Sequence, residues 1–317
     1  MNKKLLCILL ASGTTWLTHG QSDFVSVPGS AFLDNIADST LARNNPSAAS
    51  GVNAFVQRTE SESLITQRRF TLGYAYGQID SKLSDHAVTE NHSVTPDLYL
   101  ATKNGISLDT SFIYQNTSKE DNKPSHLHGN TYGIVAQPGY DLWRLIHPPG
   151  GGTPANQLVL ATALGYKRGD STLQTTAASQ ASDADTYVLG PSLTFAHVFS
   201  DTLQGFLASS YTEAWKENHP SGAASSESRT GLFALQARVD YKLMPELTAT
   251  LSSTWKHDVD QTPSPGKPVA LRDWAEFGAS LRYAVSSNVL LKAGYSYEAF
   301  RPDYESHNVV ASVLISF

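Results

Sequence analysis

From residue 68 onward, the sequence repeats short segments in which large apolar side chains alternate with small or polar ones. In RRFTLGYAYGQID, Phe70, Leu72 and Tyr74 share one face of an extended strand, and Thr71 and Gly73 share the other. A soluble sheet buries its large apolar face, whereas a closed barrel in lipid turns that face outward and keeps small or polar residues inside. The alternation therefore predicts an all-β fold, a 12-stranded antiparallel transmembrane β-barrel. We expect its strands over 68–80, 92–103, 105–117, 130–143, 157–169, 185–199, 202–216, 230–243, 246–259, 272–285, 288–301 and 307–317.

Hydropathy separates this fold from a helical membrane protein. Beyond residue 20, no run of about 18 apolar residues occurs, which argues against transmembrane helices. Segments 92–103 and 202–216 alternate poorly, so a count that differs by two strands stays open. A secreted β-sandwich or a soluble barrel also stays open, because a two-residue period describes half-buried sheets as well.

The first 20 residues, MNKKLLCILLASGTTWLTHG, have the layout of a secretory signal peptide. Two lysines precede a short apolar run over 5–11, and small or polar residues follow up to Gly20. The only cysteine, Cys7, lies in that run, so we expect neither a disulfide nor a cysteine-based metal site in the exported chain. Without the two lysines, Lys+Arg falls from 23 to 21 against 29 Asp+Glu, and the formal charge goes from −6 to −8. That balance argues against nucleic-acid binding.

The segment NVVASVLISF, residues 308–317, places apolar residues at every second position up to Phe317. It resembles the carboxy-terminal signature of bacterial outer-membrane barrel proteins. The resemblance implies that this strand closes the barrel against the first strand and is read by the barrel assembly machinery, after delivery by periplasmic chaperones. It also implies a Gram-negative cell envelope, with outer-membrane lipid and lipopolysaccharide as surroundings. The residues that would carry the assembly signal are Val309, Val313, Ile315 and Phe317.

The connections between the expected strands alternate in length. Tight links at Asn104 and near 200–201, 244–245 and 286–287 alternate with long polar stretches such as SKEDNKPSHLHG and KENHPSGAASSES. Short periplasmic turns and longer extracellular loops are typical of outer-membrane barrels, and an even strand count places both termini on the periplasmic side. One expected periplasmic link, 145–156, is long. Trp215, Trp255 and Trp274 fall at the expected outer strand ends and Trp143 at an inner end, as in interfacial aromatic girdles.

Residues 21–67 do not alternate, and Phe32, Leu33, Ile36 and Leu41 are spaced as on one face of a helix. A helix before the first strand resembles autotransporter translocator domains, whose 12-stranded barrels are threaded by such a helix. Residues 21–67 are too few for a passenger domain, so we expect a helical plug or a periplasmic segment there, or an amphipathic linker resting on the barrel mouth. The expected organisation is a signal peptide over 1–20, this helical segment over 21–67 and the barrel over 68–317.

Charged residues of the expected strands fall on the inward face. This placement agrees with energetics, because a Lys or Arg on the lipid face at the bilayer midplane costs about 2–4 kcal/mol. The later strands carry most of the bases and the earlier ones carry acids, which predicts a transverse field across a pore, as in general porins. Pairing of these charges with one another or with a plug helix is the alternative. The expected pore-lining residues are Asp109, Asp141, Lys167, Arg238, Asp240, Lys242, Lys256, Glu276, Arg282, Lys292 and Glu298.

Three functions follow as hypotheses. The first is a narrow or plugged pore, porin-like or translocator-like, with no enzyme activity and no cofactor. The second is a surface enzyme that acts at the extracellular rim through His257 and Asp258, although no opposing acidic pair is identified and no catalytic residue is assigned. The third is a structural or adhesive barrel whose polar loops bind a partner. His126 and His128 lack a nearby third ligand, so we expect no metal site.

Overall fold

The computed structural model describes residues 65–81, 88–102, 104–120, 125–146, 156–175, 179–200, 202–221, 224–259, 273–300 and 304–317. Twelve strands form, and a four-residue helix follows the fourth. Their bounds are β1 Ile65–Ser81, β2 Val88–Thr102, β3 Ile106–Glu120, β4 Ser125–Asp141, α5 Trp143–Ile146, β5 Asn156–Thr175, β6 Ser179–Ser200, β7 Leu203–Pro220, β8 Ser226–Met244, β9 Leu247–Asp258, β10 Asp273–Ala284, β11 Val289–Ala299 and β12 Tyr304–Ser316.

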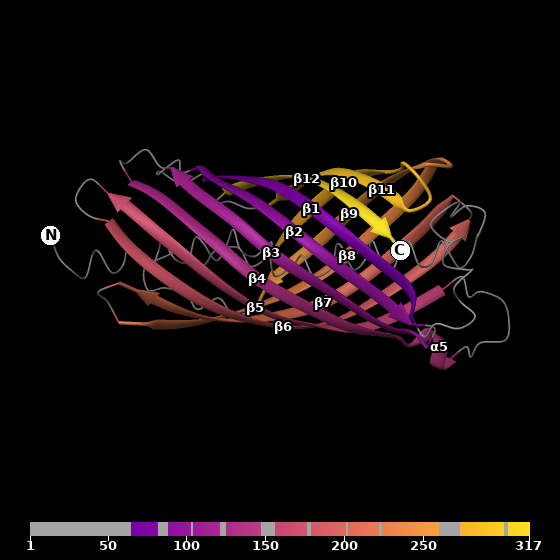
Figure 1. The fold of residues 1–317 in the computed structure, drawn as a ribbon, viewed down its shortest axis with the longest axis horizontal. Helices are drawn as coiled ribbons and strands as arrows, with labels where there is room; N and C mark the ends of the chain where they lie inside the picture. The colour runs from indigo at the N-terminus through magenta and orange to yellow at the C-terminus, as the bar shows by residue number, and fades with distance from the viewer. Residues whose placement is uncertain are drawn as a thin grey trace.

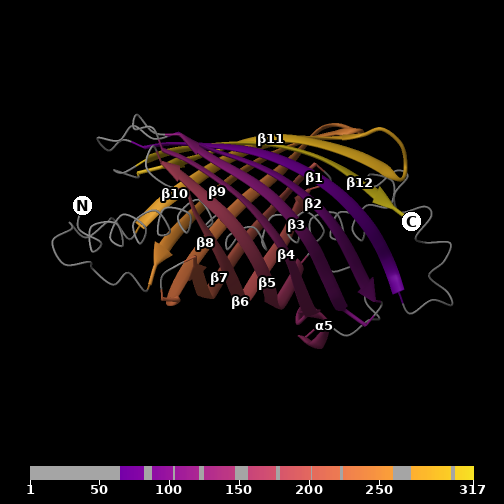
Figure 2. The same ribbon diagram turned by 60° about the vertical axis from the view of Figure 1, so that its left-hand side comes forward.

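The strands form one closed antiparallel barrel in which each strand pairs with its sequence neighbours and β12 pairs with β1. All strands are strongly tilted to the barrel axis, as Figures 1 and 2 show. The prediction of an all-β, 12-stranded barrel is confirmed, including strands at the two poorly alternating segments. None of the helices in the described part of the chain is long and apolar enough to cross a membrane.

The two ends of the barrel differ. At the end that we call the turn end, tight connections join β2 to β3, β6 to β7, β8 to β9 and β10 to β11. Figure 1 shows α5 and the end of β12 at this same end. The opposite end, here the extended end, was expected to carry long loops. Instead, several polar stretches continue the ladders: β6 begins at Ser179 rather than near 185, and β7 runs to Pro220 rather than to 216.

The extension has a physical reason. A strand needs only about 9–11 residues to cross a bilayer, whereas β5 has 20 and β6 has 22. Outside lipid the wall needs no apolar outer face, so polar residues continue the hydrogen-bonded ladder without the alternation that marks a membrane strand. Alternation therefore finds only the membrane part of each strand.

The seam between β1 and β12 is a regular antiparallel ladder from Arg69↔Ser316 to Ser81↔Tyr304. The Phe317 amide also donates to the Arg68 carbonyl, at 3.1 Å. Val309, Val313, Ile315 and Phe317 are exposed on the outer face of this seam. The predicted closure by the last strand is confirmed, while the role of these residues in assembly stays a prediction.

A designed disulfide across the seam tests closure and register together. A Cβ on Gly73 would lie 4.0 Å from the Ser312 Cβ, inside the range of about 3.5–4.5 Å for disulfides. With Cys7 replaced by Ser, we expect Gly73→Cys with Ser312→Cys to oxidise to a cross-link, seen as a mobility change on a non-reducing gel. The control pairs Gly73→Cys with Val310→Cys, which lies opposite Ala75. Equal cross-linking of both pairs would contradict the register.

The outer surface carries the apolar belt. Exposed Leu, Val, Ile and Phe side chains occupy alternate positions of every strand, among them Leu72, Leu164 and Leu251. Aromatic pairs follow the belt toward the extended end: the ring centroids of Tyr114–Tyr132, Tyr166–Tyr187 and Phe233–Trp255 lie 5.2, 5.4 and 5.9 Å apart. Their amphipathic rings suit a membrane interface.

Trp274 corrects one expectation. Trp215 and Trp255 are exposed on the outer face as predicted, but Trp274 is only 3% exposed. Trp274 and the buried Arg282 are an even number of residues apart on β10, so their side chains lie on the same face of the strand. The alternation of β10 therefore directs the Trp274 ring into the barrel. Its position at the end of the strand had led us to expect it in the outward aromatic girdle. At the turn end, Trp143 belongs to α5 rather than to a strand.

The expected plug or periplasmic segment over 21–67 and the signal peptide over 1–20 lie outside the described residues, except at the boundary. β1 begins at Ile65. Residues 65–67 therefore belong to the barrel wall rather than to the preceding segment.

Candidate functional site: the barrel lumen

The eleven residues expected to line the pore all occupy inward positions of the barrel wall. Eight are buried: Asp109, Asp141, Lys167, Arg238, Asp240, Lys256, Arg282 and Glu298. Lys242, Glu276 and Lys292 are partly buried. Their outward neighbours along the same strands, such as Leu108, Tyr166, Val239 and Leu281, are exposed. The placement agrees with the expected faces, and their role in lining a pore stays a prediction.

Near the turn end, Asp240 is the centre of an ion-paired group on β7–β10. Arg238 donates to both Asp240 carboxylate oxygens, from Nε at 2.8 Å and from Nη2 at 2.9 Å. Arg282 Nη2 donates at 2.6 Å, Gln204 Nε2 at 3.0 Å and the Thr250 hydroxyl at 2.7 Å. Arg238 also lies 5.3 Å from the Phe206 ring centroid, a cation–π distance. Every group named here is buried, so this corner of the lumen is filled by a hydrogen-bonded network.

Near the extended end, Lys256 is the centre of a second group on β9–β11. Its ammonium lies 2.8 Å from Glu276 Oε2 and 3.0 Å from Glu298 Oε1. The Trp274 indole donates to the same Glu298 oxygen at 3.1 Å. Lys256 is 0% exposed, so burial of its charge depends on these carboxylates. The inward turn of Trp274 thus has a partner that the sequence pattern did not identify.

These two groups modify the expected field. Of the residues expected to line the pore, β8–β11 carry Arg238, Lys242, Lys256, Arg282 and Lys292 against Asp240, Glu276 and Glu298, so five positive minus three negative gives +2 for this set. Most of the expected basic wall is therefore neutralised by carboxylates on the same strands. The alternative of mutual pairing holds for this side of the barrel, and the remaining transverse field is weaker than the count of bases suggested.

The acidic side lies on β2–β4. Asp97 joins the expected Asp109 and Asp141 there and is buried, with the Ser111 hydroxyl donating to its Oδ2 at 2.7 Å. Sequence reasoning missed Asp97, because His92 on the outer face and Tyr99 on the inner face obscure the alternation of β2. Asp141 accepts the amide of Trp143 at 3.1 Å and that of Leu158 at 3.4 Å. It therefore anchors the β4–α5–β5 connection as well as facing inward.

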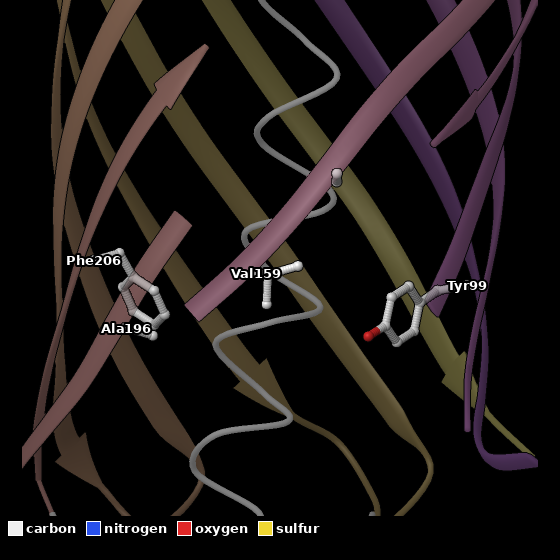
Figure 3. Close-up of a cluster of buried hydrophobic side chains, with 5 residues drawn as sticks. Tyr99, Val159, Ala196 and Phe206 are labelled. Atoms are coloured by element: carbon white, nitrogen blue, oxygen red, sulfur yellow. The ribbon is translucent and has the colours of Figure 1, made fainter. Parts of the chain in front are cut away.

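The inner face of β4–β7 differs from both charged walls, because small and apolar side chains cover most of it. One buried cluster consists of Ile113, Val135, Ala163, Val188 and Ala214, from five consecutive strands, β3 to β7. A second, nearer the turn end, consists of Tyr99, Val159, Ala161, Ala196 and Phe206. Figure 3 shows Tyr99, Val159 and Phe206 projecting toward the barrel interior. Sequence reasoning expected small or polar residues inside and missed this apolar lining.

Two lysines interrupt this face. Lys167 on β5 and Lys216 on β7 are 2% and 6% exposed, and both pair in register with Thr186 on β6, which lies between them. Gly133 on β4 is the other register partner of Lys167, and a Cβ there would lie 2.7 Å from the Lys167 Cγ. The glycine thus lets the lysine stem lie across β4. Sequence reasoning missed Lys216, because Phe206 and Ala214 place apolar residues on the inward face of β7 and obscure its alternation. The available signal was the even spacing between Thr212 and Lys216, which puts both side chains on the same face of the strand.

The residues considered for rim or metal chemistry are placed elsewhere. His257 contacts Asp273, with Nδ1 and Oδ1 2.8 Å apart, and stacks on the Trp255 ring, which faces outward. His126 lies 4.0 Å from Glu120 on the exposed end of β4. Across the described ranges, no group of three or more His, Cys, Asp or Glu side chains could hold a metal ion.

No sequence profile of a known protein family matches the chain. No curated protein matches it in sequence either. Among solved structures, the translocator domain of the autotransporter NalP from Neisseria meningitidis is similar, with a TM-score of 0.57, 12% identity, and 84% of this chain and 93% of that chain covered.

Two further structures are similar. The transport unit of the autotransporter AIDA-I from Escherichia coli has a TM-score of 0.53, 12% identity, and 82% and 92% of the two chains covered. An outer-membrane channel from Pseudomonas putida F1 has a TM-score of 0.51, 11% identity, and 79% and 95% covered. At these identities the likeness shows the fold alone: a closed antiparallel β-barrel similar to autotransporter translocator barrels, as predicted.

Proposed function

We propose that this chain forms a narrow channel in the bacterial outer membrane, with the turn end and both termini on the periplasmic side. The observation that supports it best is the two-sided lumen. Large ion-paired side chains extend from β8–β11, whereas glycine, alanine, valine and threonine cover most of the inner face of β4–β7. A permeation path would follow β4–β7, because side chains there occupy the least space. The channel needs no catalytic residue, cofactor or metal.

A conductance measurement tests the proposal. Residues 21–317, refolded into planar bilayers, should give small, uniform single-channel steps. A chain that starts at Ile65 is the matched variant: larger steps from it would mean that residues 21–64 obstruct the lumen as a plug, the alternative form of this function. If neither chain conducts although a gel shows a folded, heat-modifiable barrel, the channel proposal fails, and the polar extended end becomes the candidate site for a surface partner.

The path itself is tested with introduced cysteines in a Cys7→Ser background. Ala214 faces inward on β7, and Ala237 faces outward on β8. A charged thiol reagent should lower the current of an Ala214→Cys channel and leave that of an Ala237→Cys channel unchanged. Block in neither variant would place the path away from β4–β7.

A further inference from the structure

Two groups of tyrosine and histidine side chains lie on the outer face of the barrel, on either side of the seam between β1 and β12. In each group, two tyrosines that are two residues apart on one strand accompany a histidine on the next strand, which pairs in register with the second tyrosine. The groups are Tyr74, Tyr76 and His92 on β1–β2, and Tyr295, Tyr297 and His307 on β11–β12. The same local arrangement therefore occurs twice within four adjacent strands.

The two groups also share their hydrogen bonding. The Tyr74 hydroxyl lies 2.8 Å from His92 Nδ1, and the Tyr295 hydroxyl lies 2.6 Å from His307 Nδ1. A tyrosine hydroxyl that donates to Nδ1 leaves the ring proton of a neutral histidine on Nε2. Among the residues that the structure describes, no hydrogen-bond partner lies at either Nε2 atom. Each group therefore presents an N–H donor on the outer face.

A carboxylate accompanies each histidine. Glu90 precedes His92, and Glu305 precedes His307, by two residues on the same strand. Residues two apart on a strand share a face, so each glutamate lies about 7 Å along the strand from its histidine, nearer the extended end. Glu90 accepts the Tyr76 hydroxyl at 3.1 Å, and an ionised carboxylate can accept further hydrogen bonds. Toward the extended end, each group thus offers first a donor and then a negative charge.

Toward the turn end, both groups continue directly into the apolar belt. Leu72 precedes Tyr74 by two residues on β1 and is 47% exposed. Val309, 51% exposed, lies in register between Tyr76 and Tyr295. A ligand that covers one of these groups and the belt beside it therefore combines an apolar tail with a polar head.

We propose that each group binds the headgroup of a membrane phospholipid that carries a primary ammonium group, with the phosphate at the histidine Nε2–H and the ammonium at the glutamate. In such a lipid the phosphate lies between the acyl chains and the ammonium, which matches the order of belt, histidine and glutamate. A headgroup with a phosphate but no ammonium would bring uncompensated negative charge to Glu90 or Glu305. The site goes beyond the proposed channel function and does not depend on conduction.

Equilibrium urea unfolding of the full chain in vesicles of defined composition measures this binding. Phosphatidylcholine is the background lipid, because its methylated ammonium cannot donate a hydrogen bond to a glutamate. At a phosphatidylethanolamine content that fills nine in ten sites, each site should raise the folding equilibrium constant about tenfold. Phosphatidylglycerol, which has the phosphate without an ammonium, should raise it far less.

His92→Asn combined with His307→Asn tests the phosphate half of the site. Asparagine keeps a polar atom for the tyrosine hydroxyl but removes the Nε2 donor, so the phosphatidylethanolamine effect should disappear. Glutamine at both positions, with an amide nitrogen that reaches about as far as Nε2, should restore part of it. His257→Asn is the matched control, because His257 contacts Asp273 through Nδ1 on the same face of the barrel and no glutamate precedes it by two residues. The effect should survive this change.

Glu90→Gln combined with Glu305→Gln tests the ammonium half. Glutamine can still accept the Tyr76 hydroxyl, but the negative charge is removed. Phosphatidylglycerol should therefore stabilise this variant as strongly as phosphatidylethanolamine does.

Equal stabilisation of the wild type by phosphatidylethanolamine and phosphatidylglycerol would overturn the ammonium half, and with it the proposal. A phosphatidylethanolamine effect of the same size in the wild type and in the double asparagine variant would reflect a general bilayer property and would overturn it too. The absence of any effect on the wild type, relative to phosphatidylcholine alone, would overturn it as well. A lack of conductance, which would end the channel proposal, changes none of these results.

Discussion

Replacing Asp240 by Asn should destabilise the barrel by about 3–5 kcal/mol, the usual cost of removing one partner of a buried ion pair. The shape of the side chain is kept, but Arg238 and Arg282 lose the carboxylate that they share at 2.6–2.9 Å. Two buried guanidinium groups then remain without the charge that compensates them. The free energy of unfolding, measured by reversible urea denaturation in vesicles, should show the loss.

The control for this variant is Asp183→Asn, which breaks an ion pair with Arg168, 3.6 Å away, in which both side chains are more than half exposed. Exposed pairs contribute about 0–1 kcal/mol, so this change should be small. Arg282→Gln added to Asp240→Asn should restore part of the stability, because it removes one of the two uncompensated charges. A loss for Asp240→Asn no larger than that for Asp183→Asn would show that the network is not a buried ion pair.

Leu164→Arg should destabilise the folded, membrane-inserted barrel by about 2–4 kcal/mol. Leu164 is 50% exposed on the outer face of β5, between Ala136 and Leu189 in the adjacent strands. If the belt is embedded in lipid, the guanidinium group there is held near the bilayer midplane. The same vesicle-based unfolding measurement reports the cost, and in detergent the folded form should lose resistance to heating on a gel.

Thr172→Arg is the matched change, on the same face of the same strand beyond Arg168 and the Tyr166 ring. It lies in the part of β5 that extends past the aromatic girdle, so its cost should fall to about 0–1 kcal/mol. Equal costs at both positions would contradict the placement of the membrane along β5, and with it the outer-membrane assignment.

The sequence predicted the number of strands, their order and the inward face of eleven charged residues, because these depend on a local requirement. A strand in lipid must show an apolar side chain outward at every second position, whatever its neighbours are. For that reason even β2 and β7, whose alternation is weak, were predicted as strands. The polar extensions of β5 and β6 do not alternate, and they were therefore predicted as loops.

The partners of the inward side chains could not be predicted in the same way. Lys256 with Glu276 and Glu298, or Lys167 with Thr186 and Lys216, are brought together by the register between strands, which closure of the barrel sets across the whole wall. Alternation predicts on which face of the sheet a residue lies, but it does not predict the position of that residue along the barrel axis. The sequence by itself therefore determined the inward face of most charged side chains, although not of Asp97 or Lys216. Only the tertiary structure decided which of them meet: an ion-paired wall on β8–β11, and a wall on β4–β7 with two lysines among small and apolar side chains.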